Sequence, residues 1–480
     1  MKRNVEQMDL IRTKGAPFLG AGTKILFNES LLVKLFALED QYRYVGNMEI
    51  LEKYNKETGS WETVDEKKLV GNMLDFVIET GIQEGFTAIG FVCNVSKAEK
   101  LVRLLKSEVY IDNVPAYEQL FIHVGNGMLV FDKTAGHFVL HDYSPDFNSY
   151  NRINIAYNKD AKCPLFLNQL IGNMLPIEDC LHTFQQFIGQ CLLRNNISQT
   201  LAILSGDAEC GKSTTISILE EILGKENVAE LHPNRLGDKF EFINYQHKSL
   251  LTAKDVPFDA LSSKQIENLK KMTGGDLMSV ELKHSNKSFL CRGIFNVLIS
   301  GNGHLPIALG NTRAAFERRV LSLPCKRKKG LVRDNDLQEK ILNTEKEGIL
   351  AWAIQGAEIL LNSRGIMQLG DKQKALNSML MDESEPVKTF IREFVVETDP
   401  QKDKKGFVRS KDMFQLFQEF AGNQGWTFPI SEPKFDREIR RYMTALHPKC
   451  RESTNCISRD DPKKKCRGYL NCYLKAIDHK

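Results

Sequence analysis

Short apolar runs alternate with segments of helical periodicity through the middle of the chain. Within residues 201–330 the runs "LAIL", "LLTA", "IFNVLIS" and "VLSLP" are separated by longer stretches, several of them with helical patterns. A strand buried inside a parallel sheet is a nearly continuous apolar run, because helices cover both of its faces. Residues 201–330 therefore predict an α/β domain built on a mostly parallel sheet.

The pattern changes on both sides of this domain, and the changes delimit four further parts. Residues 1–155 mix short aromatic or branched runs with helical periods, which is typical of a small α/β or α+β accessory domain. Residues 156–200 place apolar side chains at helical spacing and predict a helical lead-in. Residues 331–384 predict helices that end in a linker at "MDESEP", and residues 385–480 predict a separate small domain.

Composition adds constraints on compartment and partners. The 480 residues are 42% hydrophobic and 26% charged, which is ordinary for a globular chain of several domains. No apolar run approaches the roughly 20 residues that cross a bilayer, and no secretory signal is evident, so we expect a cytoplasmic protein without a membrane partner. Its eleven cysteines are then expected to be reduced thiols.

Charge is distributed unevenly along the chain. The net charge is +4, but the segment from Glu385 onward holds 20 Lys and Arg against 14 Asp and Glu, which makes that segment +6. A basic small domain favours a nucleic-acid partner, although a solvated charged surface explains the charge equally well.

One motif indicates nucleotide chemistry. "GDAECGKS", from Gly206 to Ser213, fits G-x-x-x-x-G-K-S, with an apolar strand before it and an amphipathic helix after it. In such a P-loop the backbone N–H groups converge on phosphate oxygens, Lys212 contacts the β and γ phosphates, and the Ser213 hydroxyl ligates Mg²⁺. We therefore predict a nucleoside triphosphate site formed by Gly206, Asp207, Ala208, Glu209, Cys210, Gly211, Lys212, Ser213 and Thr214.

Two polar residues follow apolar strands farther along. Asp255 ends the strand at 249–253, which we expect to neighbour the P-loop strand, and its carboxylate suits both the metal and the attacking water. Asn302 follows "IFNVLIS" and is expected in the loop beside the P-loop, where its amide could orient that water. Each residue has an ordinary alternative as a surface or turn residue, and the P-loop is what favours catalysis.

Two groups of cations lie near these strands. Strands expected at 277–282 and 288–292 flank the turn "KHSNK", which predicts a hairpin with Lys283, His284 and Lys287 at its tip. Such a tip suits phosphate contacts, although a solvated turn is the commoner case. Arg318 and Arg319 directly precede "VLSLP". An arginine donated to a neighbouring subunit's ATP site accelerates hydrolysis, and the alternative is a surface ion pair.

The order of these motifs, from the P-loop through "KKMTGGD" and "ISGNGHLPI" to "ERRVLSLP", resembles the superfamily 3 helicases of the AAA+ group. The resemblance is to the D5-like or phage P4-like branch, most of all to the replication initiator-helicases of staphylococcal pathogenicity islands and resistance cassettes. It covers about residues 115–325. "HVGNGMLVFDKTAGHFVLHDYSPDF" and "CPLFLNQLI" resemble the segment that precedes the ATPase in that branch.

The resemblance implies ATP with Mg²⁺ at the P-loop and an Asn302 sensor. It also implies a Lys283–His284 pair that grips DNA in a pore, and an arginine finger for which Arg319 is the first choice and Arg318 the second. Family members form homo-oligomeric rings, commonly hexamers, that thread one DNA strand from 3′ to 5′. One departure stands out. Many members carry two adjacent acids where this chain has Lys254 and then Asp255, so one carboxylate must serve both roles or a remote one must help.

Members of this branch often carry a primase upstream. The first 155 residues contain no paired-carboxylate D-x-D at the end of a strand, so we expect no primase activity.

The last segment has the pattern of a winged helix. A helix is expected from Ser410, and a second one capped by Ser431 buries Phe435, Ile439 and Met443. The other face of the second helix carries Lys434, Arg437 and Arg441, and the turn of a following hairpin carries Lys463, Lys464 and Lys465. Such a module would lay its second helix in a major groove of duplex DNA and its wing over the backbone.

Four cysteines in this segment have the spacing C-x5-C-x9-C-x5-C. That spacing lacks the short gaps of common zinc sites, so packed thiols are favoured over zinc.

The sequence thus predicts an α/β protein with an AAA+ P-loop core, an N-terminal accessory domain, a helical lead-in and a C-terminal winged helix. The leading functional hypothesis is an ATP-dependent DNA helicase that initiates replication of a mobile genetic element. The main alternative is an origin-recognition protein whose ATPase switches assembly without unwinding. A small-molecule kinase or GTPase is disfavoured, because no N-K-x-D motif follows the P-loop.

Overall fold

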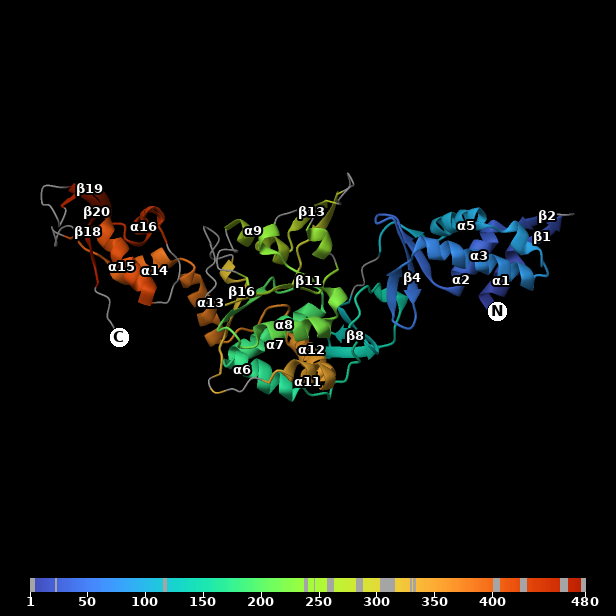
Figure 1. The fold of residues 1–480 in the computed structure, drawn as a ribbon, viewed down its shortest axis with the longest axis horizontal. Helices are drawn as coiled ribbons and strands as arrows, with labels where there is room; N and C mark the ends of the chain where they lie inside the picture. The colour runs from blue at the N-terminus through green and yellow to red at the C-terminus, as the bar shows by residue number, and fades with distance from the viewer. Residues whose placement is uncertain are drawn as a thin grey trace. The chain divides into compact units, whose positions relative to one another are not determined.

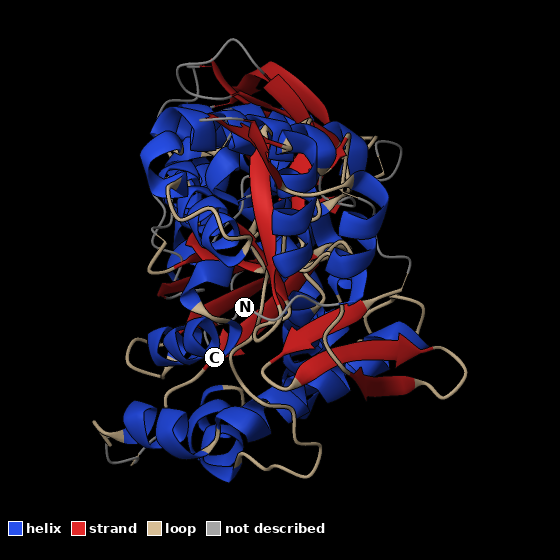
Figure 2. Ribbon diagram, turned by 90° about the vertical axis from the view of Figure 1, so that its right-hand side faces the viewer, coloured by secondary structure: helices blue, strands red, loops and turns tan. Residues whose placement is uncertain are grey.

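The structure is a computed structural model that contains both helices and strands (Figure 2). It divides into two compact units, Met1–Lys159 and Asp160–Lys480. The residues that it describes are 5–21, 24–114, 119–236, 241–245, 247–256, 263–281, 288–302, 316–328, 330, 334–399, 406–423, 430–457 and 465–475.

The first unit is an α+β domain with a small helical core. Its four-stranded sheet has the order β5-β4-β3-β6, and a separate antiparallel meander has the order β7-β8-β9. The core forms where Leu69, Met73 and Val77, spaced four residues apart on α3, meet apolar residues of α2 and α5. The helices are α1 (Val5–Lys14), α2 (Glu29–Glu39), α3 (Glu66–Gln83), α4 (Ile89–Val92) and α5 (Val95–Glu108); the strands are β1 (Phe18–Ala21), β2 (Lys24–Phe27), β3 (Tyr42–Val45), β4 (Ile50–Asn55), β5 (Ser60–Thr63), β6 (Tyr110–Ile111), β7 (Phe121–Val124), β8 (Gly127–Asp132) and β9 (His137–His141).

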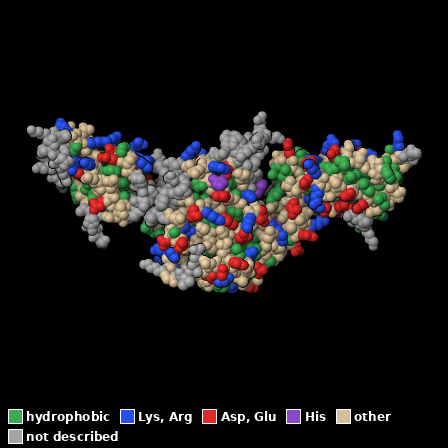
Figure 3. Space-filling view, viewed as in Figure 1, with side chains coloured by type: hydrophobic (Ala, Val, Ile, Leu, Met, Phe, Trp, Pro, Cys, Tyr) green, Lys and Arg blue, Asp and Glu red, His purple; other side chains and the backbone are tan. Residues whose placement is uncertain are grey.

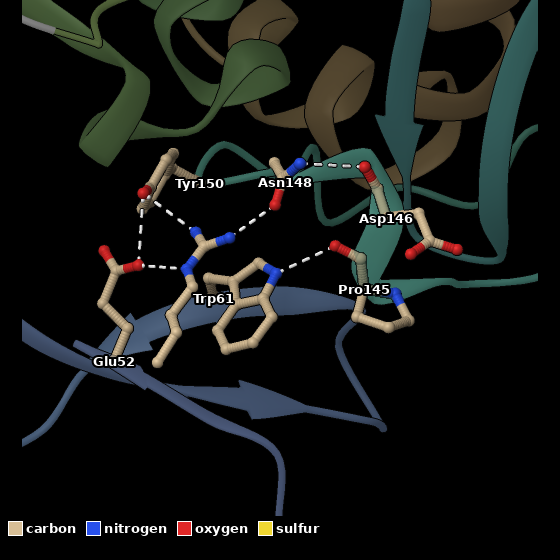
Figure 4. Close-up of polar contacts among 7 residues, drawn as sticks. Glu52, Trp61, Pro145, Asp146, Asn148 and Tyr150 are labelled. Atoms are coloured by element: carbon tan, nitrogen blue, oxygen red, sulfur yellow. Dashed lines mark hydrogen bonds and ion pairs between the residues drawn. The ribbon is translucent and has the colours of Figure 1, made fainter. Parts of the chain in front are cut away.

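A buried arginine, Arg43, links the four-stranded sheet to the segment that follows β9 (Figure 4). Arg43 on β3 pairs with Glu52 on β4 at 2.7 Å, and its guanidinium also donates to Asn148 and to Tyr150. The guanidinium stacks over the Trp61 ring at 3.8 Å. The tryptophan is therefore a packing residue, and a buried charge is stabilised by several partners at once.

The second unit is built on a five-stranded sheet in which every pair of neighbours is parallel, with the order β11-β12-β15-β10-β16. This confirms the predicted α/β class with a parallel sheet. Four of the five strands coincide with the continuous apolar runs, as burial on both faces requires, whereas the short edge strand β11, which is only partly buried, was not predicted. The strands are β10 (Leu201–Gly206), β11 (Val228–Glu230), β12 (Leu250–Ala253), β15 (Val297–Asn302) and β16 (Val320–Cys325).

Helices cover the sheet on both sides. In Figure 1, α7, α8 and α12 lie on one side of β11 and β16, and α9 with β13 lies on the other. The predicted lead-in is present as the π-helix η2 and the helices α6 and α7. The elements are η2 (Leu165–Ile171), α6 (Gly172–Met174), α7 (Glu178–Leu192), α8 (Lys212–Leu223), α9 (Ser263–Thr273), α11 (Leu337–Thr344), α12 (Lys346–Asn362) and α13 (Asp371–Glu383).

Glycines allow α7 and α12 to pack at very short distance. A Cβ on Gly189 of α7 would lie 2.1 Å from the Ala357 backbone nitrogen, and one on Gly356 of α12 would lie 2.1 Å from the Gln185 carbonyl oxygen. The two backbones therefore touch, with side chains excluded from the crossing. The helix before the sheet and the helix after it form a single layer.

The predicted linker at "MDESEP" is wrong. Helix α13 continues through Glu383, and Met381 is fully buried in the core beneath the sheet. The next helix begins at Pro386, which leaves two residues between the helices. The polar composition of the segment suggested a longer loop, but a buried Met381 and a proline at the first turn of the next helix explain why only two residues separate the helices.

The last part of the chain packs three helices on antiparallel strands. The sheet β18-β20-β19 and the pair β17-β21 enclose, with the helices, a core that includes Phe390, Phe417 and Phe435. Phe435, Ile439 and Met443 are buried as predicted. The elements are α14 (Pro386–Phe394), β17 (Val395–Glu397), β18 (Phe407–Arg409), α15 (Ser410–Asn423), α16 (Glu432–Leu446), β19 (Arg451–Ile457), β20 (Lys465–Leu470) and β21 (Cys472–Leu474).

Candidate nucleotide site

The loop between β10 and α8 has the backbone that its glycines permit. Gly206 (φ 137°) and Gly211 (φ 103°) adopt positive φ, and Glu209 lies in the left-handed region at φ 56°. A Cβ on Gly206 would lie 2.0 Å from the Cys325 carbonyl oxygen, so no other residue fits there. The loop ends at Gly211, the residue before α8, and the amino end of a helix attracts anions.

Lys212 is 4% exposed and its amine turns back onto the loop. Nζ donates to the carbonyl oxygens of Asp207 (2.5 Å) and Gly206 (3.3 Å) and lies 3.6 Å from the Cys210 sulfur. The ammonium is thus held at the mouth of the loop by neutral acceptors, which a phosphate could replace.

Asp255, Asn302 and Ser213 line one cavity with this loop. The cavity measures about 670 Å³. Asn302 is the last residue of β15, not part of the following loop, and it pairs in register with Gly206 of β10. Asp255 follows β12 with a φ of 50°, and its backbone N–H lies 3.4 Å from Ser300 Oγ. The cavity therefore brings together oxygen donors that suit Mg²⁺ and cations that suit phosphate.

One sequence-based expectation about this edge is wrong. The strand that leads to Asp255 is not the neighbour of the P-loop strand, because β15 lies between β12 and β10. β15 is buried along five of its six residues and pairs on both sides, as its apolar run allows. The carboxylate still reaches the cavity, since parallel strands end at the same edge.

Lys254, the residue that departs from the double-acid pattern, points to other partners. Its amine forms an ion pair with Glu220 of α8 at 2.7 Å and lies 3.4 Å from Ser217 Oγ. Two other carboxylates line the cavity besides Asp255. Glu209 pairs with Arg327, and Asp334 pairs with Lys340. Asp255 is thus the one carboxylate among the described lining residues for which an ion pair is not seen.

Several lining residues were missed by the sequence analysis. Lys326, Arg327 and Lys328 follow β16 directly and line the cavity, together with Gln169, Leu170 and Asn173 of the lead-in. The Arg327 backbone N–H donates to Asp207 at 2.8 Å, and its side chain pairs with Glu209 at 3.1 Å. The run "KRKK" after an apolar strand was the available signal, since residues at this edge of a parallel sheet lie near the P-loop.

The Cys210 sulfur is an acceptor within the loop. The Lys212 amine donates to it at 3.6 Å, whereas the Cys325 thiol donates to the carbonyl oxygen of Leu323 at 3.4 Å. The neighbouring Cys325 side chain is the largest cause that lowers the pKa of Cys210, to about 6, and the Lys212 ammonium acts in the same direction against the opposing effect of burial. The interaction with Cys210, together with burial, raises the pKa of Cys325.

The two arginines lie at the opposite edge of the sheet. Arg319 immediately precedes β16, and its carbonyl oxygen accepts from the Leu201 N–H at the start of β10. Its side chain is 8% exposed and lies against Gly274, whereas Arg318 is exposed. A strand of six residues spans about 20 Å, so neither arginine lies near the P-loop of its own chain.

The predicted hairpin is confirmed as β13 (Leu277–Glu281) paired antiparallel with β14 (Ser288–Arg292). Lys283, His284 and Lys287 lie outside the described residues. So do Lys463 and Lys464, whereas Lys465 is the first, exposed residue of β20.

The basic residues expected on the second tail helix are exposed on α16. Lys434, Arg437 and Arg441 surround Glu438. Burial raises the pKa of this carboxyl above its ordinary value, although the three cations act in the opposite direction. Figure 3 shows lysines and arginines with acidic side chains among them on the visible face of this domain. The face of α16 is thus basic, with one partly buried acid within it.

The four cysteines of the tail lie on or beside its strands. Cys456 and Cys466 are register partners on β19 and β20, and the thiols of Cys450 and Cys472 donate to the carbonyl oxygens of Asn471 (3.4 Å) and Tyr469 (3.6 Å). No cluster of three or more metal-binding side chains occurs within the described ranges. In the same described part of the chain, no helix has the length and apolarity needed to span a bilayer.

The parallel sheet, its loop and the cavity define an α/β fold compatible with a P-loop core. Residues 204–319 match a protein family described as "Family of unknown function (DUF5906)". The match begins inside β10 and ends at Arg319, and it covers less than half of the chain.

Among solved structures, the chain is similar to the C-terminal region of NrS-1. The A form apo structure of that region is 12% identical, with 93% of this chain and 99% of that chain covered and a TM-score of 0.48. An apo structure of residues 305–718 of NrS-1 is 11% identical, with 92% and 99% covered and a TM-score of 0.49. No curated protein sequence matches the chain.

Proposed function

We propose that this protein is an ATP-dependent DNA helicase and replication initiator of a mobile genetic element. The observation that carries the proposal is the cavity at the carboxyl edge of the sheet, where the P-loop, Asp255 and Asn302 meet. The strand order, with β15 between the P-loop strand and the acid-bearing strand, is compatible with an AAA+ core. The motif order that resembles superfamily 3 helicases gives the proposal its specific form.

In this proposal the loop backbone from Gly206 to Thr214 and the Lys212 amine hold the phosphates of ATP. Ser213 and Asp255 hold Mg²⁺, whose charge would neutralise the phosphate oxygens during hydrolysis. Asp255 polarises the attacking water, and Asn302 orients it. Both side chains are exposed at the cavity, where they can reach a nucleotide without rearrangement of the strands.

The location of the arginines supports a ring. An arginine at the amino edge of the sheet cannot complete the site of its own chain, but it can complete that of a neighbouring subunit. Of the two, Arg318 suits this role better than Arg319, because its guanidinium is already exposed. The first choice made from sequence is therefore reversed in the proposal. A homo-oligomer, commonly a hexamer, follows from the resemblance.

DNA contacts are proposed at two places. In the chain, the hairpin β13–β14 lies between β12, which leads to Asp255, and β15, which ends at Asn302. We therefore expect that a nucleotide-dependent movement of these two strands would also move the hairpin. Lys283, His284 and Lys287 would contact the backbone of one strand. The tail, proposed as a winged helix, would contact duplex through Lys434, Arg437 and Arg441 and through Lys463, Lys464 and Lys465.

Strand displacement on forked DNA tests the proposal. One strand carries a label, ATP and Mg²⁺ are present, and forks with either a 3′ or a 5′ single-stranded tail are compared. Displacement by the intact chain on the 3′-tailed fork, absent from the Lys212→Ala variant, is expected. DNA-stimulated hydrolysis without displacement on any fork would contradict the helicase and favour the assembly switch.

A further inference from the structure

An ion pair links the P-loop to the segment that follows β16. Arg327 Nη1 lies 3.1 Å from Glu209 Oε2, and both residues line the cavity. The two side chains are 59% and 58% exposed. An ion pair between side chains so accessible to water is weak, because solvent screens the attraction. The pair can therefore separate when a stronger partner for either charge enters the cavity.

The backbone of Arg327 is held more firmly than its side chain. Its N–H donates to the Asp207 carboxylate at 2.8 Å, and the Asp207 N–H donates in turn to the Cys325 carbonyl oxygen at 3.1 Å. In addition, the Lys326 N–H donates to the Met174 carbonyl oxygen at 3.0 Å. The guanidinium is thus carried by a backbone attached to both the P-loop and the lead-in, and only the side chain has to turn for it to change partner.

Glu209 puts a negative charge on the loop that is proposed to bind phosphate. Its backbone is left-handed (φ 56°), which is uncommon for a residue with a Cβ. A carboxylate beside a phosphate site repels the ligand unless a cation neutralises it. Arg327 is the cation that pairs with this carboxylate, whereas the Lys212 amine donates to the carbonyl oxygens of Gly206 and Asp207.

We propose that Glu209 holds Arg327 in the absence of nucleotide and that the triphosphate replaces Glu209 when ATP binds. A guanidinium binds carboxylate and phosphate oxygens with the same planar set of N–H donors, so the two anions compete for it. The triphosphate carries several negative charges and is bound by the loop at the same time, so it displaces the single carboxylate. Arg327 then acts within its own subunit, unlike Arg318. This inference deepens the proposed function and rests on it.

A static role for Arg327 makes the opposite prediction for the coupling between the two residues. If Arg327 moves to the phosphates, Glu209→Gln improves ATP binding most when Arg327 is present, because the change frees that arginine. If Arg327 stays on Glu209 and only neutralises it, Glu209→Gln improves binding most when Arg327 is absent, because the carboxylate then repels the phosphates without screening. The sign of the coupling therefore separates the two roles.

A double-mutant cycle on the binding of a fluorescent ATP analogue with Mg²⁺ tests the inference. The full chain is compared with Arg327→Ala, Glu209→Gln and the double variant. We expect affinity to fall about tenfold in Arg327→Ala, because a charge-assisted hydrogen bond is lost, and to rise about 2–5-fold in Glu209→Gln. The gain from Glu209→Gln should be smaller in the Arg327→Ala background. Arg327→Lys, which keeps the charge but not the planar fork, should restore only part of the affinity.

The exposed pair Arg12–Asp9 on α1 provides the matched control. Arg12→Ala and Asp9→Asn change the net charge by the same amounts as the test variants, and both should leave the affinity for the ATP analogue unchanged. Thermal unfolding is measured on every variant. The melting temperature should stay that of the intact chain, since the side chains of Arg327 and Glu209 are exposed, and a change in affinity then reports on the ligand rather than on folding.

Tripolyphosphate, which lacks a base and a sugar, is added as a competitor to identify the part of ATP that Arg327 contacts. Its affinity should show the same coupling as that of the ATP analogue. Additive effects, a larger gain from Glu209→Gln without Arg327, or a coupling absent with tripolyphosphate would each overturn the inference and leave the proposed function standing. Absence of ATP binding to the intact chain would overturn the proposed function and the inference together.

Discussion

Gly206 and Asn302 are register partners at the ends of β10 and β15. The amide proposed to orient the attacking water is therefore positioned by a ladder of backbone hydrogen bonds beside the first glycine of the P-loop. Its distance from Gly206 does not depend on the conformation of a loop. A positioning group on a strand is held more rigidly than one on a connection, which suits a role that requires a defined geometry.

Lys212→Ala is expected to lower ATP hydrolysis by on the order of 100-fold or more, because it removes the cation at the phosphates. Steady-state phosphate release measures the effect. The matched control is Lys254→Ala, since Lys254 pairs with Glu220 and does not line the cavity. Substantial ATP hydrolysis by Lys212→Ala would contradict the assignment of the active site.

Arg318→Ala is expected to permit nucleotide binding and assembly but to lower hydrolysis by roughly 10³-fold, as for other arginines acting in trans. Arg319→Ala should instead lower the melting temperature, because it removes a buried side chain, at a cost of about 1–3 kcal/mol. Hydrolysis rates and thermal unfolding separate the two effects. Normal hydrolysis by Arg318→Ala together with inactive, stably folded Arg319→Ala would return the finger to Arg319.

Lys283→Ala combined with His284→Ala is expected to retain assembly and hydrolysis but to lose unwinding, because the tip no longer grips the DNA backbone. Strand displacement and ATP hydrolysis are measured on the same preparation. Lys270→Ala with Lys271→Ala, which removes two lysines from the neighbouring helix α9, should unwind normally. Full-rate unwinding by the hairpin variant would mean that the turn is an ordinary solvated surface.

The alkylation of Cys210 should show an unusual pH profile. A pKa lowered to about 6 leaves the thiol mostly ionised at neutral pH, so the rate with iodoacetamide should already be near its plateau at pH 7. An ordinary thiol would gain rate up to about pH 9. Cys325→Ala removes the largest cause of the shift and should move the midpoint upward. A midpoint of the intact chain near pH 9 would contradict the hydrogen-bonded thiolate.

Gly189→Ala should destabilise the second unit, even though alanine favours helices, because the added Cβ has no space against Ala357 of α12. A cost of about 2–4 kcal/mol is expected for overpacking by backbone contact. Gly71→Ala is the matched control, since a Cβ at Gly71 of α3 meets nothing within 4 Å. That change should raise stability by about 0.5–1 kcal/mol. Thermal unfolding with two resolved transitions would assign each effect to its unit.

Local pattern was sufficient to predict four of the five strands of the sheet and the core of the tail, and it missed the short edge strand β11. Runs such as "LAIL" are apolar along their length because both faces are covered, and Phe435, Ile439 and Met443 repeat at the helical period. The hairpin β13–β14 was equally visible, since a polar turn separates two strand-like runs. In each case the residues whose pattern predicts the element are the same residues that form it.

Relations between distant residues were not visible. In the sheet, β15 lies between β12 and β10. This order could not be predicted, because an apolar run identifies a strand but not its neighbours in the sheet. Gly206 and Cys325 meet only because β16 lies next to β10. The burial of Met381, which extended α13 through the expected linker, likewise depends on a core that forms from other parts of the chain.

The crossing at Gly189 and Gly356 has a consequence for the modularity of the protein. Residues 201–330 hold every group proposed to act on ATP, yet among the helices described within them only α8 covers the side of the sheet on which α7 and α12 lie. The missing cover is supplied from both directions along the chain, by α7 and by α12, whose backbones touch. A transplant of the catalytic segment into another protein would therefore have to carry residues from both flanks as one inseparable block.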